Sequence, residues 1–501
     1  MHPGHRALAV LLLIGIMIAG TASGSVMHTA APRSQASMTT HGGGSDRPGW
    51  ADGAFTGTIY QNDEQAGTAA GFIRLGRNSQ RGWFTGTWTL RATQGNMSGV
   101  FFGMLLLGCC TTPAGISMPL VGVMQSNTSW FSVRIISPPG RMQVSGMRSA
   151  SFLPAPDGPY DIGTTSMHLV DREREERFTD DPSDVREMML QLWYPAAQAV
   201  GDRAAYMDAE TFDWLKHEAP IPLFWIPDDA YTSVMPHAAG DAPPADERFP
   251  VLLFSHGYDG VREIYTSLIE TLVSHGYVVA AVQHPYVAGV TVFPDGRVIE
   301  HQPAPSDPEE ADAYFSMAFD TVLDDIEYVL DVLPELDAPV RACLDLGRVG
   351  IYGHSFGGGA SAATCNRDAR VTAGAALDGF FHGGPVENGT ARPFLSLLAE
   401  GHFQRDATLR QMWNRTSGDI YMAEVAGAAH YSYTDVGLLL THLAPLIPRP
   451  LVGFGSIEPK RLMAISNAYT LAFFDVYLKG QPLDTLLDLA DRYPEVTFDY
   501  K

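Results

Sequence analysis

Apolar and polar residues follow two different patterns along the chain, and the change between them lies at the proline-rich stretch 154–159. Between residues 50 and 153, short runs of alternating apolar and polar residues are separated by glycines. A weak repeat recurs there at Gly53–Gly57, Gly82–Gly86 and Gly95–Gly99. Aromatic and β-branched residues at a period of two, with glycine turns between them, predict a small antiparallel β domain.

The role of this β domain has two interpretations. Its aromatic residues can fill a core, which would make the domain a folded spacer. Alternatively, Trp83, Trp88 and Trp130 can form a surface that binds lipid, glycan or polymer. The sequence alone does not decide between the two.

Beyond residue 160 the apolar residues form continuous runs, with helical stretches between them. Continuous runs are typical of strands in a parallel sheet, which helices bury on both faces. We therefore expect residues 160–501 to form an α/β domain with a mostly parallel central sheet. The expected strands lie at Met189–Tyr194, Phe249–Phe254, Tyr277–Val282, Arg348–Tyr352, Thr372–Leu377, Pro393–Leu398 and Ile420–Val425.

The first residues of the chain are typical of an export signal. Arg6 precedes an uninterrupted apolar run at Ala7–Ala19, and small residues follow it. The run is short for a membrane span and suits the core of a signal peptide, which we place at residues 1–24. Residues 25–49 are rich in Ser, Thr and Gly and predict a flexible linker. We expect a secreted or extracytoplasmic protein; the alternative is an uncleaved membrane anchor.

Composition narrows the range of partners. Hydrophobic residues make up 45% and charged residues 18% of the chain, which is typical of globular domains. The formal net charge of −23 disfavours binding to nucleic-acid phosphates and to anionic lipid head groups.

The four cysteines fit an oxidising compartment without requiring one. Cys109 and Cys110 are adjacent, so a bond between them would be strained. Cys343 and Cys365 could form one bridge or remain buried free thiols.

The motif with the clearest chemistry is Gly353-His354-Ser355-Phe356-Gly357. It follows a short apolar strand and precedes a helix start made of small residues. A G-x-S-x-G sequence between a strand and a helix predicts a sharp turn that exposes a serine hydroxyl at the carboxyl edge of the sheet. This context predicts the α/β-hydrolase fold, with Ser355 as the nucleophile.

A nucleophilic serine needs a base, and the base needs an acid to hold it, in the chain order Ser, acid, His. His430 lies just beyond the last expected parallel strand, where the base belongs. Asp378 ends one strand, and Glu400 and Asp406 follow the next one. Position alone leaves the acid open between Asp378 and the later pair.

The tetrahedral intermediate also needs two backbone N–H donors for its oxyanion. One is expected from Phe356, the residue after the nucleophile, and the other from Tyr258, in the loop that follows the Phe254 strand. His256 and His354 flank these motifs, and we expect them to orient loops rather than transfer protons.

Several stretches of the second domain resemble the plasma-type platelet-activating-factor acetylhydrolases, an esterase and lipase branch of the α/β hydrolases. The resemblance covers residues 160–483 and rests on Leu192–Pro195, Phe254–Gly257, Ser274–Val282, Gly353–Gly358, Ala376–Asp378 and the surroundings of His430. It implies that Asp378 is the acid and that Tyr258 and Phe356 supply the oxyanion donors. It also implies hydrolysis of short or oxidised acyl chains of phospholipids, without calcium or any other cofactor.

The chain departs from that family in two places. The β domain precedes the matching region, and the segment 206–247 has a composition of its own, with Trp214 and Leu223–Ile226. This segment could cap the pocket or meet lipid, or it could be an ordinary packed insertion.

The sequence therefore predicts a secreted serine esterase that acts on an ester or lipid and contacts a lipid surface at most transiently. No metal, no nucleic acid and no obligate protein partner is inferred. Two alternatives stay open. The first alternative is a cutinase-like polyester hydrolase or a dienelactone-type hydrolase. A cutinase-like enzyme would take its acid from the Glu400 region. The second is a surface-binding protein whose hydrolase domain is vestigial.

Overall fold

The computed structural model describes the strands between residues 53 and 147, and residues 153–501 apart from 199, 218–230, 232–233, 338 and 444–452. The expected signal peptide and linker lie outside the described residues, as does Leu223–Ile226. Within the described part of the chain, no helix has the length and apolar character needed to cross a membrane.

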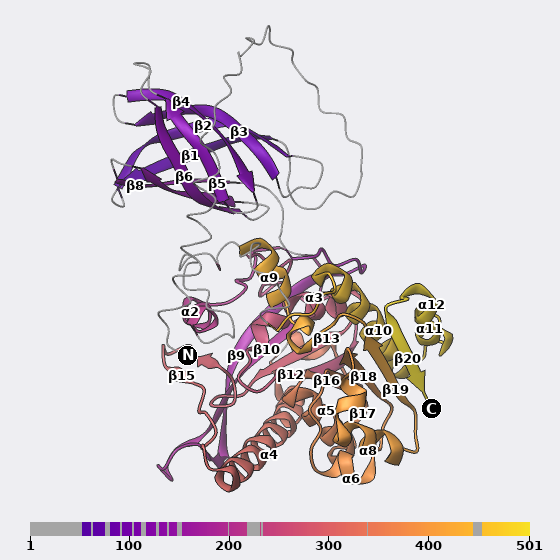
Figure 1. Ribbon diagram of the computed structural model, residues 1–501. Coiled ribbons are helices and arrows are strands. Elements are labelled where there is room, and N and C mark those ends of the chain that lie inside the picture. Colours follow the sequence, from indigo (N-terminus) through magenta and orange to yellow (C-terminus); the bar gives the residue numbers. More distant parts are fainter. Residues whose placement is uncertain are drawn as a thin grey trace. The chain divides into compact units, whose positions relative to one another are not determined.

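The glycine-punctuated segment forms a closed barrel of antiparallel strands, drawn in indigo in Figure 1. Each strand pairs with the next, and β8 closes the barrel on β1, with Thr58 opposite Ser145. The strands are β1 (Gly53–Gln61), β2 (Glu64–Leu75), β3 (Arg81–Leu90), β4 (Thr93–Phe102), β5 (Leu105–Thr111), β6 (Ser117–Ser126), β7 (Trp130–Ser137) and β8 (Gly140–Met147).

One tryptophan of the barrel belongs to its interior. Trp88 is only 7% exposed, and it lies opposite Gly95 on the neighbouring strand. A Cβ atom at Gly95 would lie 2.8 Å from the Trp88 ring, so the glycine makes room for the indole. The core interpretation therefore holds for Trp88, while the side chains of Trp83 and Trp130 lie outside the described residues.

The second part of the chain is built on a ten-stranded sheet with the order β11-β9-β10-β13-β12-β16-β17-β18-β19-β20. From β13 to β19 every neighbouring pair is parallel, whereas β9, β10 and β20 run antiparallel to a neighbour. The strands are β9 (Asp161–Glu175), β10 (Val185–Ala196), β11 (Ala239–Gly240), β12 (Phe249–Ser255), β13 (Val278–Gln283), β16 (Leu344–His354), β17 (Val371–Leu377), β18 (Phe394–Ala399), β19 (Ile420–Val425) and β20 (Val496–Tyr500). A separate hairpin pairs β14 (Val290–Val292) with β15 (Val298–Glu300).

Helices cover both faces of this sheet (Figure 1). Their bounds are α2 (Ala209–His217), α3 (Thr266–Ser274), α4 (Pro308–Val332), α5 (Phe356–Arg367), α6 (Gly384–Asn388), α7 (His402–Arg405), α8 (Ala407–Arg415), α9 (Val436–Leu443), α10 (Pro459–Lys479), α11 (Asp484–Leu487) and α12 (Leu489–Arg492).

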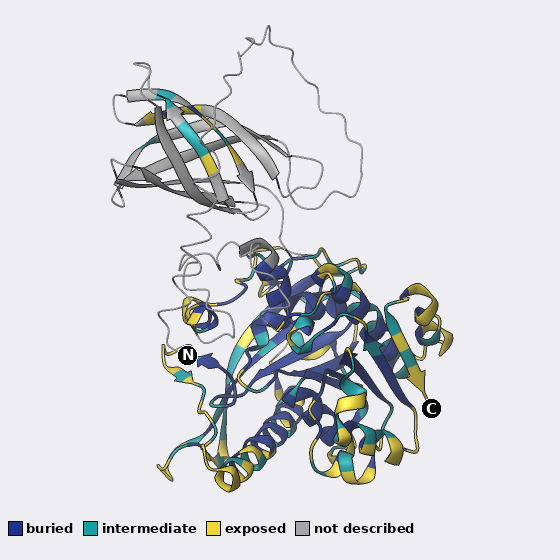
Figure 2. Ribbon diagram, in the orientation of Figure 1, coloured by how far each residue is buried: buried dark blue, intermediate teal, exposed yellow. Residues whose placement is uncertain are grey.

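Two hydrophobic cores lie on opposite faces of the sheet, and β12 contributes to both. Leu252 and Phe254 belong to the core that includes α3 and α10, whereas Val251 and Leu253 belong to the core that includes α4 and α5. Alternate residues of a strand point to opposite faces, so a strand between two helical layers must be apolar throughout. All residues of β12, β13 and β18 are indeed buried, as the dark blue strands of Figure 2 show.

This architecture confirms the predicted fold class, an α/β sheet preceded by an all-β unit. Cys343 and Cys365 are both buried and free, so the predicted alternative of a bridge between them is wrong. Burial raises the pKa of the Cys343 thiol to about 11 and that of Cys365 to about 12.

Candidate active site

The chain turns sharply between β16 and α5, and Ser355 lies at the turn with φ 54° and ψ −116°. Positive φ is unusual for a residue with a side chain and is commonly found at functional sites. The turn also brings backbone atoms close together: a Cβ atom at Gly357 would lie 2.2 Å from the carbonyl oxygen of Ser255. The conformation therefore requires glycine at position 357, and it leaves the Ser355 side chain partly exposed.

A continuous chain of hydrogen bonds joins Ser355 to His430 and Asp378. The Nε2 atom of His430 lies 2.9 Å from the Ser355 Oγ. Its Nδ1 atom lies 2.6 Å from the Oδ2 atom of Asp378. These residues follow three different strands, β16, β19 and β17, whose carboxyl ends meet at one edge of the sheet. The spacing suits proton transfer from the serine hydroxyl to the imidazole.

Asp378 is held in place by its own backbone and by the loop that follows β18. It is 3% exposed and adopts a positive φ of 48°. Its Oδ1 atom accepts hydrogen bonds from the Ala399 N–H at 2.7 Å and from His402 Nδ1 at 2.5 Å. Burial opposes ionisation, but the hydrogen bonds from His402 and His430 outweigh it and hold the pKa of Asp378 well below its usual range.

The two alternative acids have other partners. The Oε2 atom of Glu400 accepts the N–H of Gly427 at 2.8 Å, which fastens the loop before His430. Asp406 caps α8 by accepting the N–H groups of Thr408 and Leu409. The geometry therefore brings Asp378 to His430, and it uses Glu400 and Asp406 to shape the surrounding loops.

Both residues expected to supply oxyanion donors lie beside the nucleophile. Phe356 is the first residue of α5, and the first N–H groups of a helix have no acceptor within it. A Cβ atom at Gly257 would lie 3.3 Å from the Ser355 Cβ, so the loop that carries Tyr258 runs next to the serine. The rings of Tyr258 and Phe356 are 5.7 Å apart.

A second Ser–His–Asp arrangement lies buried at the base of that loop. The Ser255 Oγ is 3.1 Å from His284 Nε2, and His284 Nδ1 is 2.9 Å from an Asp325 carboxylate oxygen. All three residues are 0% exposed, so no substrate can reach this serine. His256, in turn, accepts the backbone N–H of His284 at 3.2 Å. The arrangement thus anchors the loop that precedes Tyr258.

Sequence reasoning did not find this buried arrangement. His284 follows an expected strand, but nothing near it in the sequence indicates that its partner is Asp325 on α4. The pKa of His256 is lowered to about 3, mainly by burial and also by the neighbouring His284. A neutral His256 agrees with the expected role of orienting a loop.

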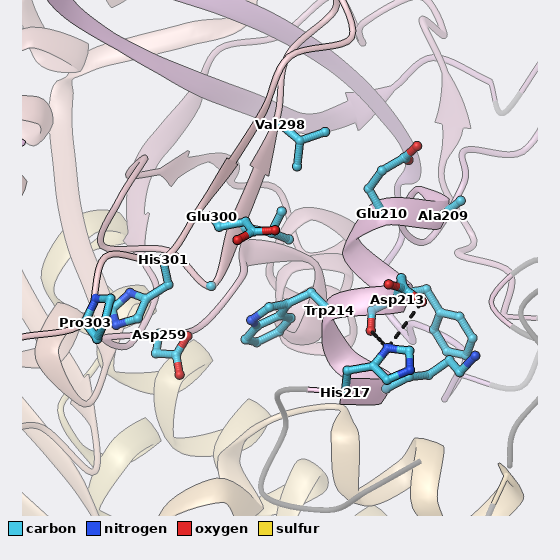
Figure 3. Close-up of a pocket in the computed structure, with 14 residues that line it drawn as sticks. Ala209, Glu210, Asp213, Trp214, His217, Asp259, Val298, Glu300, His301 and Pro303 are labelled. Atoms are coloured by element: carbon cyan, nitrogen blue, oxygen red, sulfur yellow. Dashed lines mark hydrogen bonds and ion pairs between the residues drawn. The ribbon is translucent and has the colours of Figure 1, made fainter. Parts of the chain in front are cut away.

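A cavity of about 980 Å³ adjoins the loop that carries Tyr258 and Asp259 (Figure 3). Asp259, next to Tyr258, lines one side, and Trp214 and His217 on α2 line another. The Trp214 ring lies over Gly289, where a Cβ atom would be only 2.1 Å away. The described part of the segment 206–247 thus contributes to the wall of this cavity.

Residues 145–297 and 331–485 match the sequence profile of the family described as "Platelet-activating factor acetylhydrolase, isoform II". A "Probable 1-alkyl-2-acetylglycerophosphocholine esterase" from Arthroderma benhamiae is 23% identical over 71% of this chain and 95% of that protein. A platelet-activating factor acetylhydrolase from Cavia porcellus is 26% identical over 65% of this chain and 78% of that protein.

A solved structure shows the same architecture. A ferulic acid esterase from Streptomyces cinnamoneus superimposes with a TM-score of 0.60 at 29% identity, covering 70% of this chain and 99% of that one. These findings confirm the resemblance predicted from the motifs. The chain therefore belongs to the platelet-activating factor acetylhydrolase, isoform II, family, and it is an ester hydrolase with the α/β-hydrolase fold.

Proposed function

We propose that the protein hydrolyses carboxylic esters through an acyl-enzyme, with Ser355 as nucleophile, His430 as general base and Asp378 as the acid that orients it. The observation that carries the proposal is the unbroken hydrogen-bond chain from the Ser355 Oγ through His430 to Asp378. The strained turn at Ser355 supports it independently, because such turns present a hydroxyl to the substrate.

In the first half of the reaction, His430 Nε2 takes the Ser355 proton while the Oγ attacks the ester carbonyl carbon. The carbonyl oxygen becomes an oxyanion that the amides of Phe356 and Tyr258 stabilise. Asp378 stabilises the imidazolium that forms at His430. His430 then returns the proton to the leaving alcohol, and the acyl group stays on Ser355.

In the second half, His430 activates a water molecule, which attacks the acyl-enzyme along the same path. The carboxylic acid leaves, and Ser355 regains its proton. Each turnover therefore consumes one ester and one water and returns the side chains to their initial protonation states.

The substrate class that we propose is short-acyl lipid esters, including phospholipids. The names of two relatives support it: one is a probable 1-alkyl-2-acetylglycerophosphocholine esterase and the other a platelet-activating factor acetylhydrolase. The use of Asp378, rather than Glu400, also favours this class over a cutinase-like polyester hydrolase. An intact hydrogen-bonded triad argues against a vestigial hydrolase domain.

We also propose that the protein is exported, with residues 1–24 as a signal peptide and 25–49 as a linker. The apolar run Ala7–Ala19 supports this. The β domain then spans residues 50–153 and the catalytic domain 160–501.

Hydrolysis of an ester panel tests the proposed chemistry. The panel runs from acetyl to long-chain acyl esters and includes a short-chain phospholipid. We expect wild type to favour short acyl groups and Ser355→Ala to lose several orders of magnitude in kcat. Equal activity of the two proteins, or activity on no ester, would overturn the proposal. A wild type that hydrolyses simple esters but not the phospholipid would contradict only the substrate class.

A further inference from the structure

The acid of the proposed triad contacts a second histidine, which neither the motifs nor the proposed mechanism uses. His402, the first residue of α7, places Nδ1 2.5 Å from the Oδ1 atom of Asp378. Its other ring nitrogen, Nε2, lies 3.3 Å from an oxygen of Asp406. His430 occupies the opposite oxygen of Asp378. The Asp378 carboxylate therefore lies between two imidazoles.

Both ring nitrogens of His402 face carboxylate oxygens, which only accept hydrogen bonds. A neutral imidazole can donate from one nitrogen only, whereas an imidazolium donates from both. The geometry is therefore satisfied in full by a charged His402. Its side chain is only 17% exposed, so water screens these contacts poorly.

We infer that His402 is a positioning residue for ester hydrolysis, a cation held between Asp378 and Asp406 that fixes the triad acid opposite His430. This inference rests on the proposed triad. It goes further by assigning a role to a residue that does not contact the substrate.

Other charged groups near His402 are engaged elsewhere. Glu424, on β19, accepts the backbone N–H groups of Gly401 and Phe403 at 3.0 and 3.3 Å. The guanidinium groups of Arg405 and Arg410 bind backbone carbonyls of the α7 region. The two carboxylates that bond the ring thus dominate its environment. Burial lowers the pKa of His402, but its hydrogen bonds to Asp378 and Asp406 more than compensate and raise it to about 9.

The charge of His402 has a consequence for His430. A cation beyond the carboxylate weakens the attraction between Asp378 and a protonated His430. The hydrogen bond from His402 also prevents Asp378 from rotating away. The hydrogen bond of His402 and its charge can be tested separately, because one substitution can remove the charge and keep a hydrogen-bond donor.

Three variants make this separation. His402→Leu removes both the hydrogen bond and the charge. His402→Asn keeps a donor where Nδ1 was, but removes the charge. Asp406→Asn keeps the cap of α8, since Asn and Asp cap equally well, and offers the Nε2 atom of His402 a neutral partner that favours the uncharged ring.

The experiment compares pH profiles of kcat and KM for these variants, with Ser355→Ala measured alongside. We expect His402→Leu to lower kcat about tenfold or more with KM nearly unchanged, and His402→Asn to recover most of the loss. We expect Asp406→Asn to lower kcat by less than His402→Leu does, because it keeps the hydrogen bond from His402 to Asp378. Unchanged kcat and an unchanged profile in His402→Leu would overturn the inference.

A spectroscopic readout is independent of turnover. NMR titration of the His402 ring in Ser355→Ala should show loss of its proton near pH 9. In the double variant that also carries Asp406→Asn, the ring should lose its proton at clearly lower pH. A His402 that titrates at an ordinary value, unaffected by Asp406→Asn, would refute the inference even if His402→Leu did not fold. If Ser355→Ala remained active, the proposed function itself would fail; an inactive Ser355→Ala beside an unaffected His402→Leu would reject only the role of His402.

Discussion

The Nε2 atom of His354 donates a hydrogen bond to the backbone carbonyl of His430 across 3.0 Å. The other ring nitrogen, Nδ1, accepts the hydroxyl proton of Tyr265 at 2.9 Å, which fixes the tautomer of His354. His354 precedes Ser355 in the sequence, so its buried, neutral imidazole connects the turn at Ser355 to the loop that carries His430. This agrees with the expectation that His354 orients a loop.

The neutral state of His354 makes stability depend on pH. Burial, followed by repulsion from His430, lowers its pKa to about 3, while an unfolded chain would bind a proton at an ordinary value near 6.5. Between these values the unfolded state binds more protons, so stability must fall as pH decreases from about 6.5 towards 3. His354→Gln cannot titrate, although its amide can still donate to the His430 carbonyl.

We expect the unfolding free energy of wild type to change with pH more steeply than that of His354→Gln, by up to about 1.4 kcal/mol per pH unit within this window. Urea unfolding at several pH values measures the difference. Parallel curves for the two proteins would show that His354 is already protonated in the folded state.

The choice of acid leads to a second prediction. Asp378→Asn leaves the side-chain shape intact but no longer stabilises the His430 imidazolium, so we expect kcat to fall about 10⁴-fold. Glu400→Gln is the matched control, and its kcat should stay within about threefold of the wild-type value. Within the described part of the chain, the Glu400 side chain bonds only the backbone N–H of Gly427, which a glutamine oxygen can also accept. A larger loss in Glu400→Gln than in Asp378→Asn would move the acid to the later loop.

A third prediction concerns the turn that carries Ser355. A methyl group at position 357 would meet the carbonyl oxygens of Ser255 and His256 at 2.2 and 2.5 Å. Backbone atoms cannot yield as a flexible side chain would, so Gly357→Ala should give a protein that is misfolded or at least a hundredfold less active, of the order expected when catalytic geometry is displaced by about 1 Å. Gly384→Ala is the control, since nothing lies within 4 Å of its Cβ position. Activity assays and circular dichroism compare them, and a fully active Gly357→Ala would contradict the described turn.

The buried anchor of the loop that precedes Tyr258 gives a fourth prediction. Arg186 and Asp325 form two hydrogen bonds of 3.0 and 2.7 Å, and both residues are 0% exposed. Removing Asp325 leaves the buried Arg186 with Glu176 as its one remaining carboxylate among the described residues, so Asp325→Ala should destabilise the protein by about 3–5 kcal/mol. The control is the exposed ion pair of Arg370 and Asp331, where Asp331→Ala should lower the free energy of unfolding by no more than about 1 kcal/mol. Urea midpoints that fell equally in both variants would contradict the buried anchor.

The sequence was most informative where a strand is buried on both faces. β12 and β18 were predicted within a residue or two because both of their faces are buried and nearly all of their residues are apolar. The strand β9, next to the short edge strand β11, and the edge strand β20 were missed. Their exposed positions carry charged residues, as in Asp171–Glu175, and give no continuous apolar run.

The sequence also predicted which residues would make up the candidate site. Ser355 and His430 follow from the order of motifs and strands, which needs no long-range information. Asp378 and Glu400 follow adjacent parallel strands, and only the backbone conformation after β17, with its positive φ at Asp378, decides which carboxylate meets His430. Arg186 and Asp325 are 139 residues apart, so no local pattern could reveal their pairing.

The central claim is that Ser355 is the nucleophile that His430 activates. The most direct measurement is the reaction of the wild-type protein with an organophosphonate, followed by mass spectrometry of the intact protein and its peptides. We predict one adduct per chain, on the peptide that contains Ser355, with activity lost in proportion to labelling and with labelling strongly slowed in His430→Ala. An adduct on another residue, or activity that survives complete modification of Ser355, would contradict the account.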